Sequence, residues 1–197
     1  PSVATSRTTA RPAAAKAGGP SRSPATHLMS TTTSKGTAME ARAQARVSHP
    51  NVVHIYYVGM SQDCPFFAME LVPGQSLAKL ISERRLTFQE IIQIGLQTAN
   101  ALGHSASLGV IHGDVKPGNL LLNDCSLIKL SDFGLASRAD DANAAASKSG
   151  PAGTLNYMAP EVAAGQPANI QSDMYSLGVM LYELTFGELP HEASSDS

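Results

Sequence analysis

The stretch that decides the fold is HGDVKPGNLLLNDCSLIKLSDFG, residues 112–134. Within it, two short apolar runs at 120–122 and 127–130 flank the polar residues 123–126, a pattern that predicts a β-hairpin. Polar clusters stand immediately before the first run and immediately after the second. Because folding a hairpin brings its two ends together, we expect these clusters to meet on a rigid scaffold.

The polar clusters contain the residue types that phosphoryl transfer requires. Asn119 and Asp132 offer hard oxygen ligands for Mg²⁺, so we expect them to bind the metal. Lys116 can offset charge on a moving phosphoryl group, and Asp114 can orient an attacking hydroxyl or accept its proton. The sequence therefore predicts a phosphoryl-transfer site with Asp114 and Lys116 as its catalytic residues.

Composition limits the other functions of the chain. Its 197 residues, 43% of them hydrophobic, can form one sizeable core or two small lobes around a cleft. A net charge of -2 provides no basic surface, so we expect no nucleic-acid partner. Cys64 and Cys125 lie far apart and predict neither a disulfide framework nor a zinc site, which favours the reducing cytoplasm.

The ends of the chain differ from its middle. Residues 1–38 are dominated by Ala, Ser, Thr, Pro and Gly, which predicts a low-complexity, disordered segment or the remnant of a folded one. The chain opens on Pro1 rather than Met, and we expect a gene fragment, a processed product or a misassigned start. No apolar run approaches the ~20 residues that span a bilayer, so we expect no membrane segment here, although a longer parent protein could carry an anchor.

Residue patterns predict helices and strands on either side of the hairpin. Residues 39–48 favour a helix that ends at His49-Pro50, and the apolar segments 52–60 and 64–72 favour an antiparallel pair of strands. A last helix is predicted at 174–184, before Gly187.

A longer helix is predicted from residue 88, because Thr87 and Glu90 have capping-box spacing. Its apolar residues recur at helical spacing, which indicates a face directed at the core. The residues expected on that face are Phe88, Ile91, Ile92, Leu96, Ala99 and Leu102.

Five ordered motifs resemble the protein kinase family. HGDVKPGN at 112–119 resembles its catalytic loop, and SDFG at 131–134 resembles its metal-binding motif. GTLNYMAPE at 153–161 and SDMYSLGVMLYEL at 172–184 are similar to its substrate-docking segment and to the central helix of its large lobe. The resemblance covers about residues 40–190 and implies an α+β, protein-kinase-like fold of two lobes.

The resemblance divides the chain after the low-complexity segment 1–38. It implies a truncated small β lobe at 39–72 and a mainly helical large lobe at 73–197 that lacks its last helices. It also implies ATP and Mg²⁺ as cofactors. Because Asp-x-Lys-x-x-Asn at 114–119 resembles Ser/Thr-specific kinases, it implies transfer of the γ-phosphoryl group to Ser or Thr of a protein substrate. Thr154 would contact the catalytic Asp and Lys.

The resemblance assigns further residues to nucleotide binding. MEARAQARVSHPNVV at 39–53 is similar to the helix with the family's ion-pairing Glu, which would be Glu40. FFAMELVPGQSL at 66–77 is similar to the strand and hinge that hold adenine, with Met69 as the gatekeeper. The remaining residues implied in nucleotide binding are Glu70, Val72 and Leu121.

The chain departs from the family pattern in two places. Gly113 replaces the usual Arg before the catalytic Asp, so we expect a loop at 138–153, containing Ser147 and Ser149, that does not depend on phosphorylation. The glycine-rich loop and the Val-Ala-x-Lys strand that clamp the phosphates are not found. The best match to the strand is ATHLM, which places His27 where the lysine belongs.

Two alternatives to an active kinase follow from these departures. One is a pseudokinase or inactive fragment that keeps the fold and binds a partner. The other is a small-molecule phosphotransferase of the aminoglycoside or choline type, because His-Gly-Asp at 112–114 followed by Asn119 is similar to that group. Lys116, the Asp-Phe-Gly at 132–134 and the Ala-Pro-Glu at 159–161 argue against the second alternative.

Several residues have a structural interpretation beside the functional one. We expect His112 to be a buried histidine that orients the loop rather than a catalytic group. Asp173 could be a helix N-cap or, as the resemblance implies, a brace for the backbone of the catalytic loop, and both interpretations stay open. Met158 is expected to fill the core, and Cys125 to be an inert turn residue.

Overall fold

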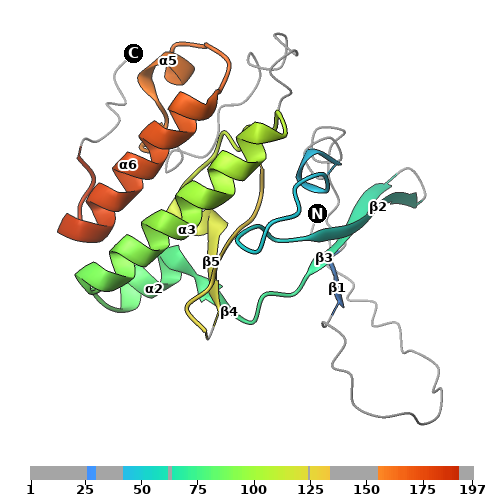
Figure 1. Ribbon diagram of the computed structural model, residues 1–197, viewed down its shortest axis with the longest axis horizontal. Helices are drawn as coiled ribbons and strands as arrows, with labels where there is room; N and C mark the ends of the chain where they lie inside the picture. Colours follow the sequence, from blue (N-terminus) through green and yellow to red (C-terminus); the bar gives the residue numbers. More distant parts are fainter. Residues whose placement is uncertain (1–25, 30–41, 62–63, 124, 134–154, 191–197) are drawn as a thin grey trace, which may run out of the picture.

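The computed structural model describes residues 26–29, 42–61, 64–123, 125–133 and 155–190 (Figure 1). A small sheet of three strands lies on one side of the molecule, and the helices gather around a second three-stranded sheet on the other. This arrangement confirms the predicted α+β class.

The small sheet has the strand order β1-β3-β2, and both of its strand pairs are antiparallel. Strand β1 is Thr26–Met29, β2 is Ile55–Ser61 and β3 is Cys64–Glu70. The predicted antiparallel pair is therefore confirmed as β2 and β3. The segment ATHLM supplies β1, whose His27 lies opposite Met69 in the register.

The second sheet contains the predicted hairpin. Strand β5, Leu120–Asn123, pairs antiparallel with β6, Ile128–Leu130. In the turn, Asn123 Oδ1 accepts hydrogen bonds from the backbone N–H groups of Cys125 and Leu127, each at 2.9 Å. This confirms the hairpin and explains the asparagine at its first turn position.

Strand β4, Gly74–Ser76, completes the second sheet and was not predicted. It is only three residues long and opens on Gly74, with φ at 138° and its Cα against Leu122. A Cβ at this position would collide with the Leu122 carbonyl, so the glycine permits the pairing rather than breaking it.

The two longest helices of the described residues pack against each other. Helix α3, Phe88–Ser107, begins with the predicted capping box, in which the Thr87 N–H donates to Glu90 Oε2 at 2.8 Å. Helix α6, Ile170–Phe186, lies beside α3 and ends at Gly187 with φ of 79°. The shorter elements are α2 (Leu77–Glu83), the 3₁₀ helix η1 (Pro117–Asn119) and α5 (Pro160–Ala163). Among the helices of the described ranges, none combines the length and apolar character needed to cross a bilayer.

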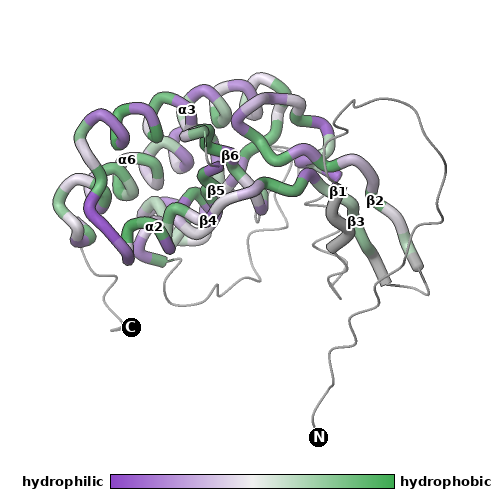
Figure 2. The backbone as a smooth tube through the Cα atoms, turned by 90° about the horizontal axis from the view of Figure 1, so that it is seen from below, coloured by the Kyte–Doolittle hydropathy of each residue, from purple (hydrophilic) through white to green (hydrophobic). Residues whose placement is uncertain are grey.

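The main hydrophobic core lies between the helices and the second sheet. In Figure 2 the hydrophobic colouring runs through β5 and β6 in the middle of the molecule. The largest side chains that are almost completely buried include Leu77, Leu102, Leu120, Ile128, Leu130, Phe133 and Met180. The hairpin therefore stands on packed apolar contacts, while at its open end Asn119 and Ser131 are buried and Asp132 is exposed.

Residues 51–53 connect the small sheet to this core. The Val53 N–H donates to the Leu130 carbonyl at 2.9 Å, and the Leu130 N–H donates to the Asn51 carbonyl at 2.8 Å. The Asn51 side chain also donates to the Ile128 carbonyl at 2.9 Å and to Gln97 Oε1 at 2.8 Å. These bonds fix β6 against both the small sheet and α3.

The predicted core face of α3 is partly wrong. Ile91 and Leu102 are buried, but Phe88, Ile92 and Leu96 are exposed by 72%, 38% and 55%. The buried face instead includes the polar residues Thr98 and Ser105, whose hydroxyls donate to the carbonyls four residues earlier, at 2.7 and 2.9 Å. Because these hydroxyls are satisfied within the helix, they can be buried where a polarity pattern does not expect them.

The helix predicted at 39–48 is shorter than expected at its described end. Only residues 42–44 are helical from residue 42 onward, and the chain then turns. Val47 is buried in the core, and its N–H bonds to the carbonyl of Gln44 at 2.9 Å, three residues back. The chain therefore makes a tight turn at these residues, where the prediction had another helical turn.

The corrected face of α3 leads to a test with two leucines. Leu102→Ala should lower the free energy of unfolding by about 2–5 kcal/mol, because it removes a fully buried side chain from the core. Leu96→Ala, on the same helix, should change it by less than about 0.5 kcal/mol. Urea denaturation of both variants measures the difference, and equal losses would restore the predicted face.

Candidate active site

The predicted catalytic loop is tied to α6 by one buried carboxylate. Asp173 is 2% exposed, and its two oxygens accept the backbone N–H groups of His112 at 2.9 Å and Gly113 at 2.8 Å. Asn169 caps α6, so the N-cap interpretation of Asp173 is wrong and the brace is confirmed. Burial raises the pKa of Asp173, while His112 and the two N–H groups oppose the rise.

His112 is a structural residue, as predicted. Its ring is fully buried beside Phe133, with ring centroids 4.5 Å apart. Its Nδ1 accepts the Asp114 N–H at 3.1 Å, so the ring proton belongs on Nε2, which lies 3.1 Å from the Ser131 carbonyl. Burial lowers the pKa of His112, which favours this neutral form at neutral pH.

Asp114, Lys116 and Asn119 come together as the sequence predicts. Lys116 Nζ lies 2.7 Å from Asp114 Oδ2, and both side chains are about four-fifths buried, with exposures of 22% and 18%. Asn119 Nδ2 donates to the same Asp114 oxygen at 2.9 Å and to the Asp114 carbonyl at 2.8 Å. The Lys116 and Asn119 side chains thus both hold the same carboxylate oxygen of Asp114, Oδ2.

Ser131 links this group to Asp132 across the open end of the hairpin. Its N–H and its hydroxyl both donate to the Asn119 carbonyl, at 2.9 and 3.1 Å. The next residue, Asp132, has φ of 57° and an exposed side chain. This left-handed conformation directs the chain so that Phe133 is buried while Asp132 stays at the surface.

The chemistry of Asn119 and Asp132 fits a magnesium ion. The Asn119 amide nitrogen is used by Asp114, so the amide oxygen Oδ1 is the end of that side chain suited to a cation. Asp132 supplies a carboxylate on an exposed residue. Both are the oxygen ligands that Mg²⁺ prefers.

The residues assigned to adenine lie along β3 and β5. Met69 is half-buried near the end of β3, Glu70 ends that strand, and Val72 follows it half-buried. Leu121 is half-buried in β5, opposite Lys129 of β6. Lys129 Nζ forms an ion pair with Glu70 Oε2 at 2.8 Å, which joins the hinge to the hairpin.

Two of the predicted site residues, Glu40 and Thr154, lie outside the described residues, as do Gly134 and the loop at 138–153. Their predicted roles therefore stay predictions.

Sequence reasoning missed Ser131 and Lys129 as supports of the site. Lys129 stands between the buried residues Ile128 and Leu130, so strand alternation alone would place its side chain on the other face of β6. Ser131 carries no such signal, because only the folded hairpin brings it to Asn119.

The chain belongs to the protein kinase family, whose protein kinase domain matches residues 4–197. The match extends beyond the motifs at 40–190, into the low-complexity beginning of the chain.

Curated relatives are bacterial serine/threonine kinases. The chain is 37% identical over 157 residues to a probable serine/threonine-protein kinase of Clostridium acetobutylicum, covering 79% of this chain and 24% of that protein. It is 36% identical over 167 residues to the probable kinase PknB of Bifidobacterium longum, with shares of 79% and 24%. It is 34% identical over 156 residues to PknB of Mycobacterium leprae, with shares of 77% and 25%. The chain thus spans about a quarter of the length of these relatives.

The Asp173 brace can be tested directly. Asp173→Ala should lower the free energy of unfolding by about 2–4 kcal/mol, because it leaves two loop N–H groups without their buried acceptor. Amide exchange of His112 and Gly113 should also become faster than that of α3. The exposed Glu188→Ala is the matched control, and unchanged exchange at both amides would contradict the brace.

Proposed function

We propose that this protein transfers the γ-phosphoryl group of ATP to a Ser or Thr hydroxyl of a protein substrate. The observation that carries the proposal is the fixed position of the Asp114 carboxylate, which is held at one oxygen by Lys116 and Asn119. A carboxylate held in this way is aligned before the substrate arrives.

The proposed reaction assigns a task to each of these residues. The substrate hydroxyl oxygen attacks the γ-phosphorus, its proton passes to Asp114, and the bond from the γ-phosphorus to the bridging oxygen of ADP breaks. Lys116 lies next to the attacking oxygen and offsets charge on the transferred group. Asn119 and Asp132 would hold Mg²⁺, which neutralises charge on the nucleotide phosphates.

The residues at the hinge support a purine nucleotide as the phosphoryl donor. Met69, Val72 and Leu121 are half-buried apolar side chains on β3, the following segment and β5, a combination suited to the flat face of adenine. The Glu70–Lys129 ion pair ties the end of β3 to β6 of the hairpin, next to the proposed phosphate end of the site. The protein substrate is supported by the names of the curated relatives.

The division of labour between Asp114 and Asp132 gives a test in the protein at its natural length. Asp114→Asn should abolish phosphorylation of a generic Ser/Thr protein while nucleotide binding with Mg²⁺, measured by thermal shift, stays within about twofold. Asp132→Ala should instead lose the part of nucleotide binding that depends on Mg²⁺. Glu83→Gln removes an exposed carboxylate outside the cluster and should behave as wild type. Wild-type turnover by Asp114→Asn would refute the assignment.

One observation favours the pseudokinase alternative. Strand β1 enters the small sheet with His27 opposite Met69, at the position that the resemblance gives to a lysine. An ordinary histidine is mostly uncharged at neutral pH, so it supplies less attraction to phosphates than a lysine.

This alternative is tested by restoring the charge. His27→Lys should raise kcat/KM for ATP by about tenfold or more if the protein is a kinase impaired at this position. Thr26→Lys, which adds the same charge one residue away in the same strand, is the matched control. Failure of both the wild type and His27→Lys to bind Mg²⁺ nucleotide would favour the pseudokinase.

A further inference from the structure

A cavity of about 490 Å³ lies beside the proposed catalytic residues. It is lined by Lys116, Pro117 and Gly118 of the catalytic loop on one side, and by residues of α2, the 84–86 segment and the end of α6 on the others. Because Lys116 contacts Asp114, a peptide that presents its hydroxyl to Asp114 has this cavity next to it. The charges in the cavity wall therefore bear on which peptides fit.

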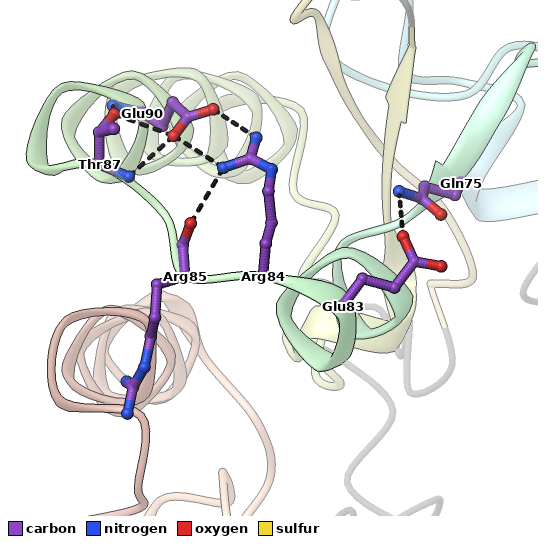
Figure 3. A network of polar contacts seen from close by, with 6 residues as sticks. All are labelled: Gln75, Glu83, Arg84, Arg85, Thr87 and Glu90. Carbon is purple, nitrogen blue, oxygen red and sulfur yellow. Dashed lines mark hydrogen bonds and ion pairs between the residues drawn. The ribbon is translucent and has the colours of Figure 1, made fainter.

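The first cation of the wall, Arg84, is already occupied. Its guanidinium forms two bonds to the Glu90 carboxylate, at 2.6 and 3.1 Å, and also donates to the Arg85 carbonyl at 3.0 Å (Figure 3). The backbone bond to residue 85 fixes the point from which the Arg85 side chain leaves. Figure 3 shows that side chain running away from the Arg84–Glu90 network toward the end of α6.

Arg85 is the cation that remains available. It is exposed, and no carboxylate of the described residues lies within 4.0 Å of its guanidinium. The guanidinium lies against Gly187, where a Cβ would collide with it. The guanidinium thus lies at the carboxyl end of α6, whose partial negative charge favours a cation there.

Glu183 is the carboxylate of the same wall, and it already has a partner. The Tyr157 hydroxyl donates to Glu183 Oε2 at 2.6 Å, and both residues line the cavity. Burial, together with this carboxylate, raises the pKa of Tyr157, so the hydroxyl keeps its proton and the bond persists at neutral pH. Lys116 is likewise paired with Asp114, which leaves Arg85 as the wall charge with no ion-pair partner in the described part of the chain.

We propose that this cavity is a subsite for an acidic side chain of the protein substrate, with Arg85 as the residue that determines the preference. This inference rests on the proposed function, since it names the class of peptide that the kinase site accepts. A carboxylate that enters the cavity meets the Arg85 guanidinium in its wall, whose planar donors suit it. A basic side chain would meet Arg85 with like charge, and the Glu183 carboxylate that could attract it already accepts the Tyr157 hydroxyl.

The test compares peptides that differ in one charge. A Ser-containing peptide is prepared with Glu, Gln or Lys at each position beside the acceptor in turn, and KM and kcat are measured with the protein at its natural length. At one position, wild type should show a KM about threefold to tenfold lower for Glu than for Gln, the range of a partly exposed ion pair. Arg85→Ala should abolish this difference, and Arg85→Glu should reverse it in favour of Lys.

The controls separate this proposal from the function on which it rests. Arg46→Ala removes an exposed arginine that does not line the cavity, and this variant should keep the Glu preference. A thermal melt shows whether each variant folds. The affinity of the same labelled peptides is also measured by fluorescence anisotropy. If the protein phosphorylates none of the peptides but still binds the Glu peptide more tightly in a way that depends on Arg85, the proposed function is rejected and the subsite is kept. Phosphorylation without a Glu preference, or a Lys preference that Glu183→Gln removes, would overturn the subsite.

Discussion

The site depends on the pair of hydrogen bonds that the buried Asp173 carboxylate accepts from the backbone of His112 and Gly113. A carboxylate is buried only if its oxygens are satisfied, and here backbone N–H groups of a loop satisfy them. The same bonds place the loop relative to α6, which is itself packed into the core by Leu177, Met180 and Leu184. The position of Asp114 is therefore set by a helix that contributes nothing to the chemistry.

Further hydrogen bonds connect His112 to the other residues of the site and fix their positions. The His112 ring bonds to the Ser131 carbonyl, directly after β6. The Ser131 hydroxyl in turn donates to the carbonyl of Asn119 in η1. The Asn119 side chain then donates to the Asp114 carboxylate. Each residue is held by a neighbour from a different part of the loop or hairpin, so backbone groups and short side chains position the Asp114 carboxylate together with Lys116.

The sequence predicted what local rules determine and missed what tertiary contacts determine. The hairpin, the capping box of α3 and the end of α6 at Gly187 follow from turn and capping chemistry, which acts within a few residues. The buried face of α3 does not, because the self-satisfied hydroxyls of Thr98 and Ser105 look polar in the sequence. The meeting of Asp114, Lys116 and Asn119 was predictable from spacing, whereas the role of Ser131 and the choice between two roles for Asp173 needed the fold.

Two residues of the site, Gly113 and Asp132, have left-handed backbone conformations. Their different roles explain why the family's usual Arg can be replaced by glycine at 113, whereas an Asp is kept at 132. Gly113 has φ of 75° and Asp132 has φ of 57°. A left-handed conformation costs a residue with a Cβ roughly 1 kcal/mol, and glycine avoids that cost. At position 113 the structure uses only the backbone N–H, so glycine relieves the strain and loses no contact to Asp173. At position 132 the proposed chemistry needs a carboxylate, so the strain has to remain where the side chain is required.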